Sequence, residues 1–198
     1  MKKLLIGTSN QAKIQTYKTL LKEFNFELVT SKDLNIPAPE ETGANLEDVA
    51  VAKAKYYFEK SGLPSLVDDG GMEIEALNGE PGVKSHRWIG RQMKDHEIVA
   101  EVMNRMKDVP KDQRHCRFRV VLALATEVGI FTSEAEVVGV VSDEPSKQMV
   151  KGYPYDAVLF LPNYGKFVCE LSETDYEIMN HRRHAMEKLH DILIDLSK

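Results

Sequence analysis

The sequence predicts an α/β fold within a single domain. Short apolar segments typical of buried strands alternate with segments in which apolar residues recur at helical spacing. Two strand-like segments, 118–125 and 129–142, follow one another closely and indicate a long antiparallel pair. The 198 residues, 42% of them hydrophobic and 29% charged, are enough to bury the core of one domain with two lobes, residues 1–198.

Composition excludes several classes of function. Lysine and arginine number 26 against 31 aspartates and glutamates, and no basic tract is long enough to follow a phosphate backbone, so we expect no nucleic acid polymer as a partner. No apolar stretch approaches the ~20 residues of a membrane span. Polar residues 8–10 end the apolar N-terminal run too early for a signal peptide. The two cysteines, Cys116 and Cys169, lack partner spacing, which is typical of a reducing compartment. We therefore expect a cytoplasmic protein with no membrane contact.

The first predicted element is a buried strand over residues 3–8, followed by a helix. The apolar positions of this helix are Ile14, Tyr17, Leu20, Leu21 and Phe24. Thr8, Ser9, Asn10 and Lys13 gather at its N-terminus, where N–H groups and the positive end of the helix dipole favour phosphate. Many α/β proteins begin in this way, and the glycine patterns of P-loop and dinucleotide-binding folds do not occur in the sequence.

A second strand is predicted over residues 26–30, and a second helix begins after Asn45. Asn45 and Asp48 form a capping-box pattern at the start of this helix. Lys53 adjoins the apolar face of the helix, which leaves two interpretations. The sequence alone favours a lysine that extends along the surface into solvent, and the alternative is an ammonium group turned into a cleft.

The next segment, residues 66–74, begins as a predicted strand and contains two adjacent acids and two glycines. Asp68 and Asp69 follow two apolar residues, and we expect the strand to end there and the backbone to turn sharply at Gly70 and Gly71. A pair of acids at a strand end is a common way to hold a hard divalent cation against phosphate oxygens. Taken alone, an ordinary turn is the better interpretation, because aspartate and glycine dominate turns.

The second half of the chain contains an aromatic loop. This loop is the stiff segment 152–156, which precedes a predicted strand over residues 158–161. Before it, the sequence predicts a turn-rich loop over residues 77–82 and a helix over residues 95–107. Tyrosines beside an acid suit a flat heterocycle, through stacking and a hydrogen bond. The alternative, and the commoner outcome, is that both tyrosine rings cover the edge of the core.

Two capped helices are predicted at the C-terminal end. Ser172 caps a short helix and Asn180 caps the last one. The apolar positions of the last helix are Ala185, Leu189, Ile192, Leu193 and Leu196. His181 and Arg182 lie at its N-terminus, where donors face an acceptor-rich ligand. The spacing of His181 and His184 does not indicate a zinc site, because no third ligand accompanies them.

Together and in this order, these motifs resemble the inosine triphosphate pyrophosphatase family, which removes non-standard purine nucleotides. The resemblance covers nearly the whole chain. The motifs that carry it are Thr8-x-Asn10-x-x-Lys13, Glu41-Thr42-Gly43 followed by Lys53, Asp68-Asp69-x-Gly71, Pro81-Gly82-Val83-x-Ser85-x-Arg87, the loop 152–156 and His181-Arg182.

The resemblance implies a fold, an activity and a cofactor. Members have a two-lobed α/β fold with a long mixed central β-sheet flanked by helices, a nucleotide cleft between the lobes, and usually a homodimeric assembly. They convert purine nucleoside triphosphates, namely ITP, dITP and XTP, to the monophosphate and pyrophosphate. The implied cofactor is Mg²⁺, with Mn²⁺ as the alternative.

Roles follow by position in the resembling motifs. Asp69 is implied as the general base and, with Glu41, as a metal ligand, while Asp68 supports this acidic centre as a further candidate ligand. Lys53 is implied both in catalysis and in holding the triphosphate. The other residues implied in substrate binding are Thr8, Ser9, Asn10, Lys13, Gly70, Tyr153, Pro154, Tyr155, Asp156, Tyr176, His181 and Arg182.

The implied roles agree with elementary chemistry. Lysines and a helix N-terminus neutralise a triphosphate, and a metal-bound water has a depressed pKa, so that a carboxylate can complete its deprotonation. A 6-oxo purine needs a donor aimed at O6, which Arg182 or protonated His181 supplies. Adenine presents an amino group at that position and leaves the donor unpaired.

The sequence departs from the family pattern around the base pocket. Gly70 stands where the family usually has serine, and Asn180 replaces the usual serine before His-Arg. Tyr176 stands where a lysine usually reaches the substrate, and Pro154 replaces a glycine of the aromatic loop. Two further hypotheses follow: the same chemistry on another modified nucleotide, or a nucleotide-binding protein with weakened catalysis.

Overall fold

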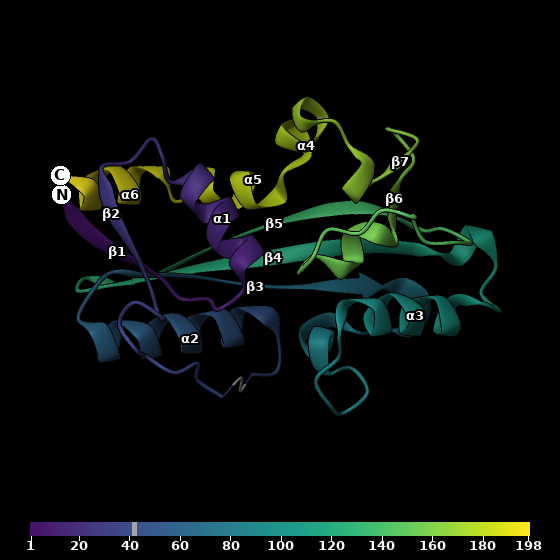
Figure 1. Ribbon diagram of the computed structural model, residues 1–198, viewed down its shortest axis with the longest axis horizontal. Helices are drawn as coiled ribbons and strands as arrows, with labels where there is room; N and C mark the ends of the chain where they lie inside the picture. The colour runs from purple at the N-terminus through teal and green to yellow at the C-terminus, as the bar shows by residue number, and fades with distance from the viewer. Residues whose placement is uncertain (41–42) are drawn as a thin grey trace. The chain divides into compact units, whose positions relative to one another are not determined.

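The computed structural model describes residues 1–40 and 43–198 (Figure 1), and strands alternate with helices only as far as the strand that begins at His115. The strands are β1 (Lys2–Ile6), β2 (Phe26–Thr30), β3 (Ser65–Ile74), β4 (His115–Thr126), β5 (Gly129–Val141), β6 (Leu159–Leu161) and β7 (Lys166–Phe167). The helices are α1 (Gln11–Leu20), α2 (Leu46–Ser61), α3 (Asp95–Met106), α4 (Glu173–Met179), α5 (His181–Glu187) and α6 (His190–Ser197). Within the described part of the chain, every helix is too short or too polar to cross a membrane.

The seven strands form one mixed sheet in the order β2-β1-β3-β4-β5-β6-β7. β1 pairs in parallel with both β2 and β3, as expected when helices connect successive strands. The pairs β5–β6 and β6–β7 are antiparallel. The predicted α/β fold with a long mixed sheet flanked by helices is confirmed.

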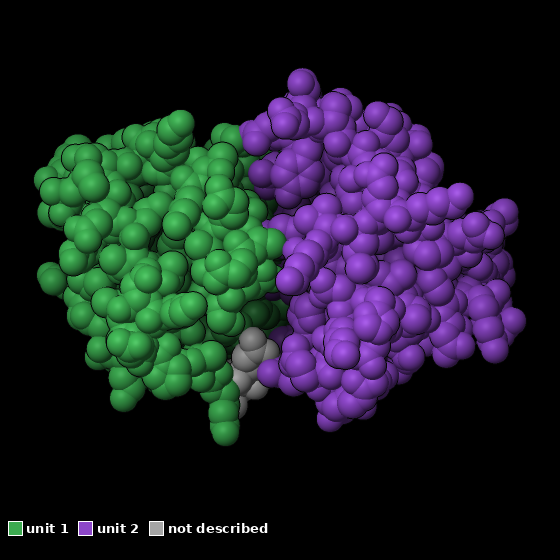
Figure 2. Space-filling view, viewed as in Figure 1, with its two compact units in different colours: residues 1–69, 120–135, 182–198 green, residues 70–119, 136–181 purple. Residues whose placement is uncertain are grey.

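The chain separates into two compact units, coloured green and purple in Figure 2. Unit 1 comprises residues 1–69, 120–135 and 182–198, and unit 2 comprises residues 70–119 and 136–181. The boundaries fall inside β3, β4 and β5, so each of these strands continues from one unit into the other. Neither unit is a contiguous stretch of sequence.

The core of unit 1 lies on both faces of its part of the sheet. α1, α5 and α6 cover one face and α2 covers the other (Figure 1). Tyr17 of α1 and Leu189, just before α6, pack with Leu122 of β4 in one apolar cluster. On α2, Ala50 and Ala54 are fully buried, and their small side chains allow close approach to the strands.

In the core of unit 2, β3 packs against α3. Met72 and Ile74 of β3 pack with Ile98, Val102 and Met106 of α3, and all five side chains are fully buried. The three α3 positions recur at helical spacing, which is the pattern that predicted this helix.

Asparagine side chains cap the first two helices, at Asn10 and, as predicted, at Asn45. The Asn10 side chain accepts hydrogen bonds from the backbone N–H groups of Ala12 (2.9 Å) and Lys13 (3.4 Å). The Asn45 side chain accepts from the Asp48 N–H at 2.9 Å. Each cap satisfies N–H groups that have no partner within the helix, and so fixes where the helix begins.

The expected turn at residues 68–71 is wrong, because β3 runs without interruption from Ser65 to Ile74. Local turn preference gives way to strand pairing and burial here. At Gly71, a Cβ atom would lie 2.2 Å from the carbonyl oxygen of Gly82, so only glycine fits. The predicted last helix also differs, since it divides into α5 and α6.

Candidate functional site

The two acids of β3 point to different surroundings. Successive side chains of a strand alternate between the faces of a sheet. Asp68 accordingly meets residues of α1 and α5, on one face of unit 1, whereas Asp69 meets a residue of α2, on the other. The pair is therefore two separate carboxylates and not one acidic cluster.

Asp68 is a buried anion held by two cations. Its side chain has no exposed surface, Oδ1 lies 2.9 Å from Lys13 Nζ, and Oδ2 accepts a hydrogen bond from Arg182 Nε at 3.1 Å. Burial raises the pKa of Asp68, but attraction to Lys13 and then to Arg182 outweighs it and holds the pKa well below the usual value. Asp68 thus links the start of α1 to the start of α5.

Asp69 is partly exposed and is paired with Lys53. Nζ of Lys53 donates to Oδ1 of Asp69 at 3.1 Å, and the exposed fractions of the two side chains are 15% and 13%. The interpretation of Lys53 as a lysine extending into solvent is wrong, since its ammonium turns toward a carboxylate. A charge-assisted hydrogen bond of this kind orients the carboxylate while leaving part of it open to water.

The N-terminus of α1 carries four of the predicted phosphate-binding residues. Thr8 and Asn10 are partly buried, Ser9 is exposed, and the Asn10 N–H donates to Oγ1 of Thr8 at 3.2 Å. No acidic residue occurs in the first turn of α1. Lys13 uses one of its three ammonium protons on Asp68, which leaves donors for an anion.

The aromatic loop of unit 2 forms a short 3₁₀ turn, Pro154–Ala157. The Gly152 N–H donates to Oδ2 of Asp95 at 2.7 Å, which fixes the loop to the start of α3. Pro154 and Tyr155 are buried, and burial raises the pKa of Tyr155. The alternative in which a tyrosine covers the core therefore holds for Tyr155, whereas Tyr153 and Asp156 are partly exposed.

Three more predicted residues belong to unit 2: Gly70, Tyr176 and His181. Tyr176 packs against the unit 2 core as a partly buried ring. His181 is 3% exposed, and the Phe118 ring packs against it with a centroid separation of 5.3 Å. Sequence reasoning missed Phe118, because the segment that contains it indicates only a strand.

The described side chains supply part of a magnesium-binding site. Mg²⁺ is usually bound by one or two carboxylates together with substrate phosphates, and Asp69 supplies one partly exposed carboxylate. Glu41, the other predicted ligand, lies outside the described residues. Among those that are described, no group of three metal-binding side chains comes together.

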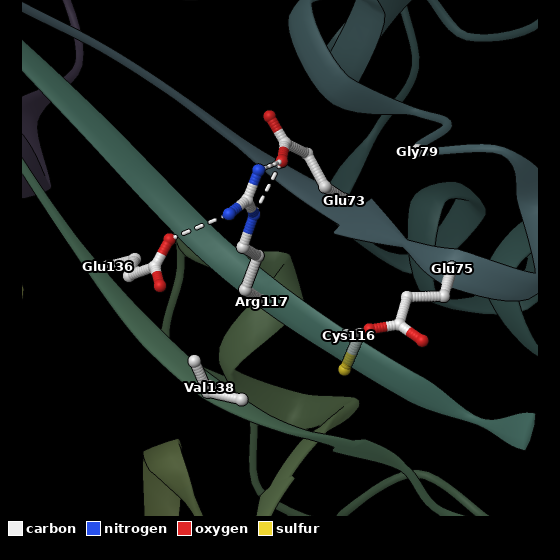
Figure 3. Close-up of a pocket in the computed structure, with 7 residues that line it drawn as sticks. All are labelled: Glu73, Glu75, Gly79, Cys116, Arg117, Glu136 and Val138. Carbon is white, nitrogen blue, oxygen red and sulfur yellow. Dashed lines mark hydrogen bonds and ion pairs between the residues drawn. The ribbon is translucent and has the colours of Figure 1, made fainter.

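A cavity of about 460 Å³ lies in unit 2 (Figure 3). Its lining residues are Glu73, Glu75, Gly79, Cys116, Arg117, Glu136 and Val138, none of which was predicted as a site residue. Arg117 bridges Glu73 and Glu136, with Nε donating to Glu73 at 2.6 Å and Nη1 to Glu136 at 3.0 Å. The lining of this cavity therefore contains three carboxylates and one guanidinium, and Arg117 pairs with two of the three acids.

Comparison with known proteins places the chain in a family. The profile of the Ham1 family matches residues 4–192. The chain belongs to the Ham1 family. This confirms the resemblance drawn from the motifs, because relatives of the chain are dITP/XTP pyrophosphatases. The protein of that name from Shigella flexneri is 33% identical over 98% of each chain, and the one from Escherichia coli K12 is 32% identical over the same share.

Solved Ham1 structures share the fold. A HAM1 protein from Coxiella burnetii superposes with a TM-score of 0.87 at 27% identity, covering 98% of this chain and all of that one. A nucleoside-triphosphatase, also named dITP/XTP pyrophosphatase, from Mycobacterium abscessus gives 0.76 at 31% identity, covering 94% of this chain and 98% of its own. The similarity therefore extends over essentially the whole chain.

Proposed function

We propose that this Ham1 protein hydrolyses the non-standard purine nucleoside triphosphates ITP, dITP and XTP to the monophosphate and pyrophosphate. The observation that carries the proposal is the pairing of Asp69 with Lys53 beside a buried Asp68 that holds Lys13. Two lysines and a capped helix N-terminus are suited to a polyanion, and a partly exposed carboxylate is suited to a water molecule.

In the proposed reaction Asp69 acts as the general base. It accepts a proton from a water molecule whose oxygen attacks the α-phosphorus, the bond from that phosphorus to the bridging oxygen breaks, and pyrophosphate leaves with the bonding electrons. Lys53 orients Asp69 in the resting state and stabilises negative charge on the phosphates. Lys13, fixed by Asp68, donates its remaining protons to phosphate oxygens.

Mg²⁺ is the proposed cofactor, with Mn²⁺ as the alternative, and Asp69 and Glu41 are the proposed ligands. When bound, the ion supplies a water of lowered pKa and neutralises phosphate oxygens. Asp68 is fully buried and already paired with two cations, so we propose that it supports the centre through Lys13 and Arg182.

Base recognition is proposed for His181 and Arg182, with Tyr153 stacking on the purine and Tyr155 and Asp156 completing the loop. A donor aimed at O6 distinguishes hypoxanthine and xanthine from adenine. We further propose a cytoplasmic homodimer that acts on free nucleotides and not on a nucleic acid polymer. Light scattering tests the homodimer, and polynucleotide binding assays test the restriction to free nucleotides.

A nucleotide panel tests the proposed activity. Purified protein with Mg²⁺ is incubated with ITP, dITP, XTP, GTP and ATP, and the monophosphate and pyrophosphate are quantified. ITP, dITP and XTP are expected to be the preferred substrates. The hypothesis fails if no triphosphate is turned over with either Mg²⁺ or Mn²⁺. Tight nucleotide binding without product would instead support a binding protein with weakened catalysis.

The role of Asp69 as the general base has its own test. Asp69→Asn keeps the shape of the side chain but removes its proton-accepting charge, so the rate is expected to fall by about 10²–10⁴-fold. Asp195→Asn is the matched control, because Asp195 belongs to the same unit but pairs with Lys198 on the surface. Full activity of the Asp69 variant would refute the assignment.

A second candidate substrate is another modified nucleotide, favoured by Gly70. The family usually has a serine there, whereas in this chain a Cβ at position 70 would lie only 3.1 Å from the Arg119 carbonyl oxygen of the neighbouring strand. The same panel, extended to modified purines, distinguishes the two candidates.

A further inference from the structure

Gly70 makes room for an aromatic ring. A Cβ atom built at this position would lie 3.1 Å from Cε1 and 3.4 Å from Cζ of Phe118, and 3.1 Å from the carbonyl oxygen of Arg119. The shorter distances are tighter than most contacts of a real Cβ. The carbonyl belongs to the backbone of β4, so the ring is the group that must yield to any larger side chain.

The Phe118 ring packs against two buried residues of the predicted base pocket. Its centroid lies 5.3 Å from that of His181 with an interplanar angle of 61°, and 5.9 Å from that of Tyr155 with an angle of 46°. These separations are within the range in which aromatic edges and faces attract. His181 and Tyr155 are 3% and 4% exposed, so neither can move aside into solvent.

We infer that Gly70 and Phe118 act as a pair that sets the position of His181, and through it the discrimination between purine bases. The inference rests on the proposed function, in which His181 recognises the edge of the base. Phe118 is a positioning residue in this scheme. It does not touch the substrate, and it acts by holding the imidazole ring in one orientation.

The effect on specificity follows from hydrogen-bond geometry. A donor that is displaced or tilted loses much of its bond to O6, because the interaction weakens steeply with distance and angle. A ligand that offers no acceptor at that position loses nothing. A shift of Phe118 therefore lowers kcat/KM for ITP more than for ATP, and the ratio of the two falls.

In this scheme Gly70 is an indirect determinant of the discrimination between purine bases. A serine at this position is usual in the family that the sequence resembles, and there it would bring its own hydroxyl group. In this chain the space beside Gly70 is taken by the Phe118 ring. Restoring the serine without changing Phe118 is thus expected to harm the pocket and not to repair it.

Three variants and one control test the pair. The variants are Gly70→Ser, Phe118→Leu and the double substitution. The control is Phe160→Leu, because Phe160 also makes an edge-to-face contact in unit 2, with Phe167 at 5.3 Å and 76°. Urea unfolding establishes that each variant is folded, and Phe118→Met replaces Phe118→Leu if the smaller side chain unfolds the protein.

The first measurement is the ratio of kcat/KM for ITP to that for ATP. Gly70→Ser and Phe118→Leu are each expected to lower the ratio by roughly three- to tenfold, in line with the strength of an aromatic pair. Because leucine leaves room for the serine side chain, Gly70→Ser is expected to have a smaller effect in the F118L background. Phe160→Leu leaves the ratio unchanged. Ratios within twofold of wild type in both single variants, or effects that simply multiply, would overturn the inference.

The second measurement does not depend on turnover. The imidazole C–H resonances of His181, assigned by their loss in His181→Gln, report the ring current of Phe118. They are expected to shift in G70S and F118L but not in F160L. Absence of turnover in the wild-type protein would sink the proposed function alone. In that case, unchanged His181 resonances in both variants would sink the packing inference, and shifted ones would support it.

Discussion

Replacing Asp68 with asparagine tests how unit 1 is held together. The substitution keeps the size of the side chain but removes the charge that balances Lys13 and Arg182. Lys13 is 19% exposed and can turn toward water, whereas Arg182 is 3% exposed and cannot. The variant therefore leaves one arginine buried without its counter-charge.

The expected cost follows from that burial. Removing one partner of a buried ion pair typically costs about 3–5 kcal/mol. That is a large fraction of the roughly 5–15 kcal/mol by which domains are stable. Urea unfolding followed by circular dichroism measures the loss, with the m value as a check that the same surface is exposed.

Asp195→Asn is the matched control for this experiment. It breaks a surface pair in the same unit, with both side chains at least 70% exposed, so a loss below about 1 kcal/mol is expected. The double variant Asp68→Leu with Arg182→Met removes both charges and is expected to recover part of the loss. If Asp68→Asn costs no more than the control, the idea that this carboxylate holds the two cations is refuted.

Three other predictions follow from the packing and the charges. The folded state lowers the pKa of Asp68. The stabilisation that this carboxylate provides is therefore present above its unfolded pKa and is lost as the pH falls toward its folded pKa. The free energy of unfolding should consequently fall more steeply below about pH 4 in wild type than in Asp68→Asn. Gly71→Ala drives a Cβ into the carbonyl of Gly82 and should lower the free energy of unfolding by about 3 kcal/mol or more. Gly62→Ala meets no atom within 4 Å, but its φ of +66° disfavours alanine, so its cost should be only about 1–2 kcal/mol. Urea unfolding of both variants measures the difference. Burial raises the pKa of Cys116 to about 12, so this thiol should resist alkylation at pH 8 until the protein is unfolded, as mass spectrometry of labelled peptides would show; rapid labelling of the native protein would contradict this.

Most of the fold could be predicted because its signals are local. Apolar periodicity and a terminal Asn identified α1 and α2, and alternation identified β5. The path of β3 through Gly70 and Gly71 could not be predicted, because the same residues favour turns in isolation. What keeps the strand extended is its pairing and the close approach of the Gly82 carbonyl to Gly71, neither of which is visible in a local segment.

The sequence predicted which residues belong to the candidate site but not how they are arranged. The motifs identified Asp68, Asp69, Lys13 and Lys53 together, but not which lysine meets which acid. That pairing depends on the alternation of side chains along β3 and on the helix that covers each face. Phe118 was missed because its contacts with distant aromatic residues arise from tertiary packing, and the segment that contains it indicates only a strand.

The Asp68–Arg182 contact also has a consequence for how the protein is made. The two residues are separated by 114 positions. At about 5–20 residues per second, a ribosome needs roughly 6–23 s to travel from one codon to the other. During that interval the acid exists without its arginine, and the C-terminal segment of unit 1 has not been synthesised. The strand that carries both acids therefore has only one of the two cations on Asp68 available until the C-terminal segment is made.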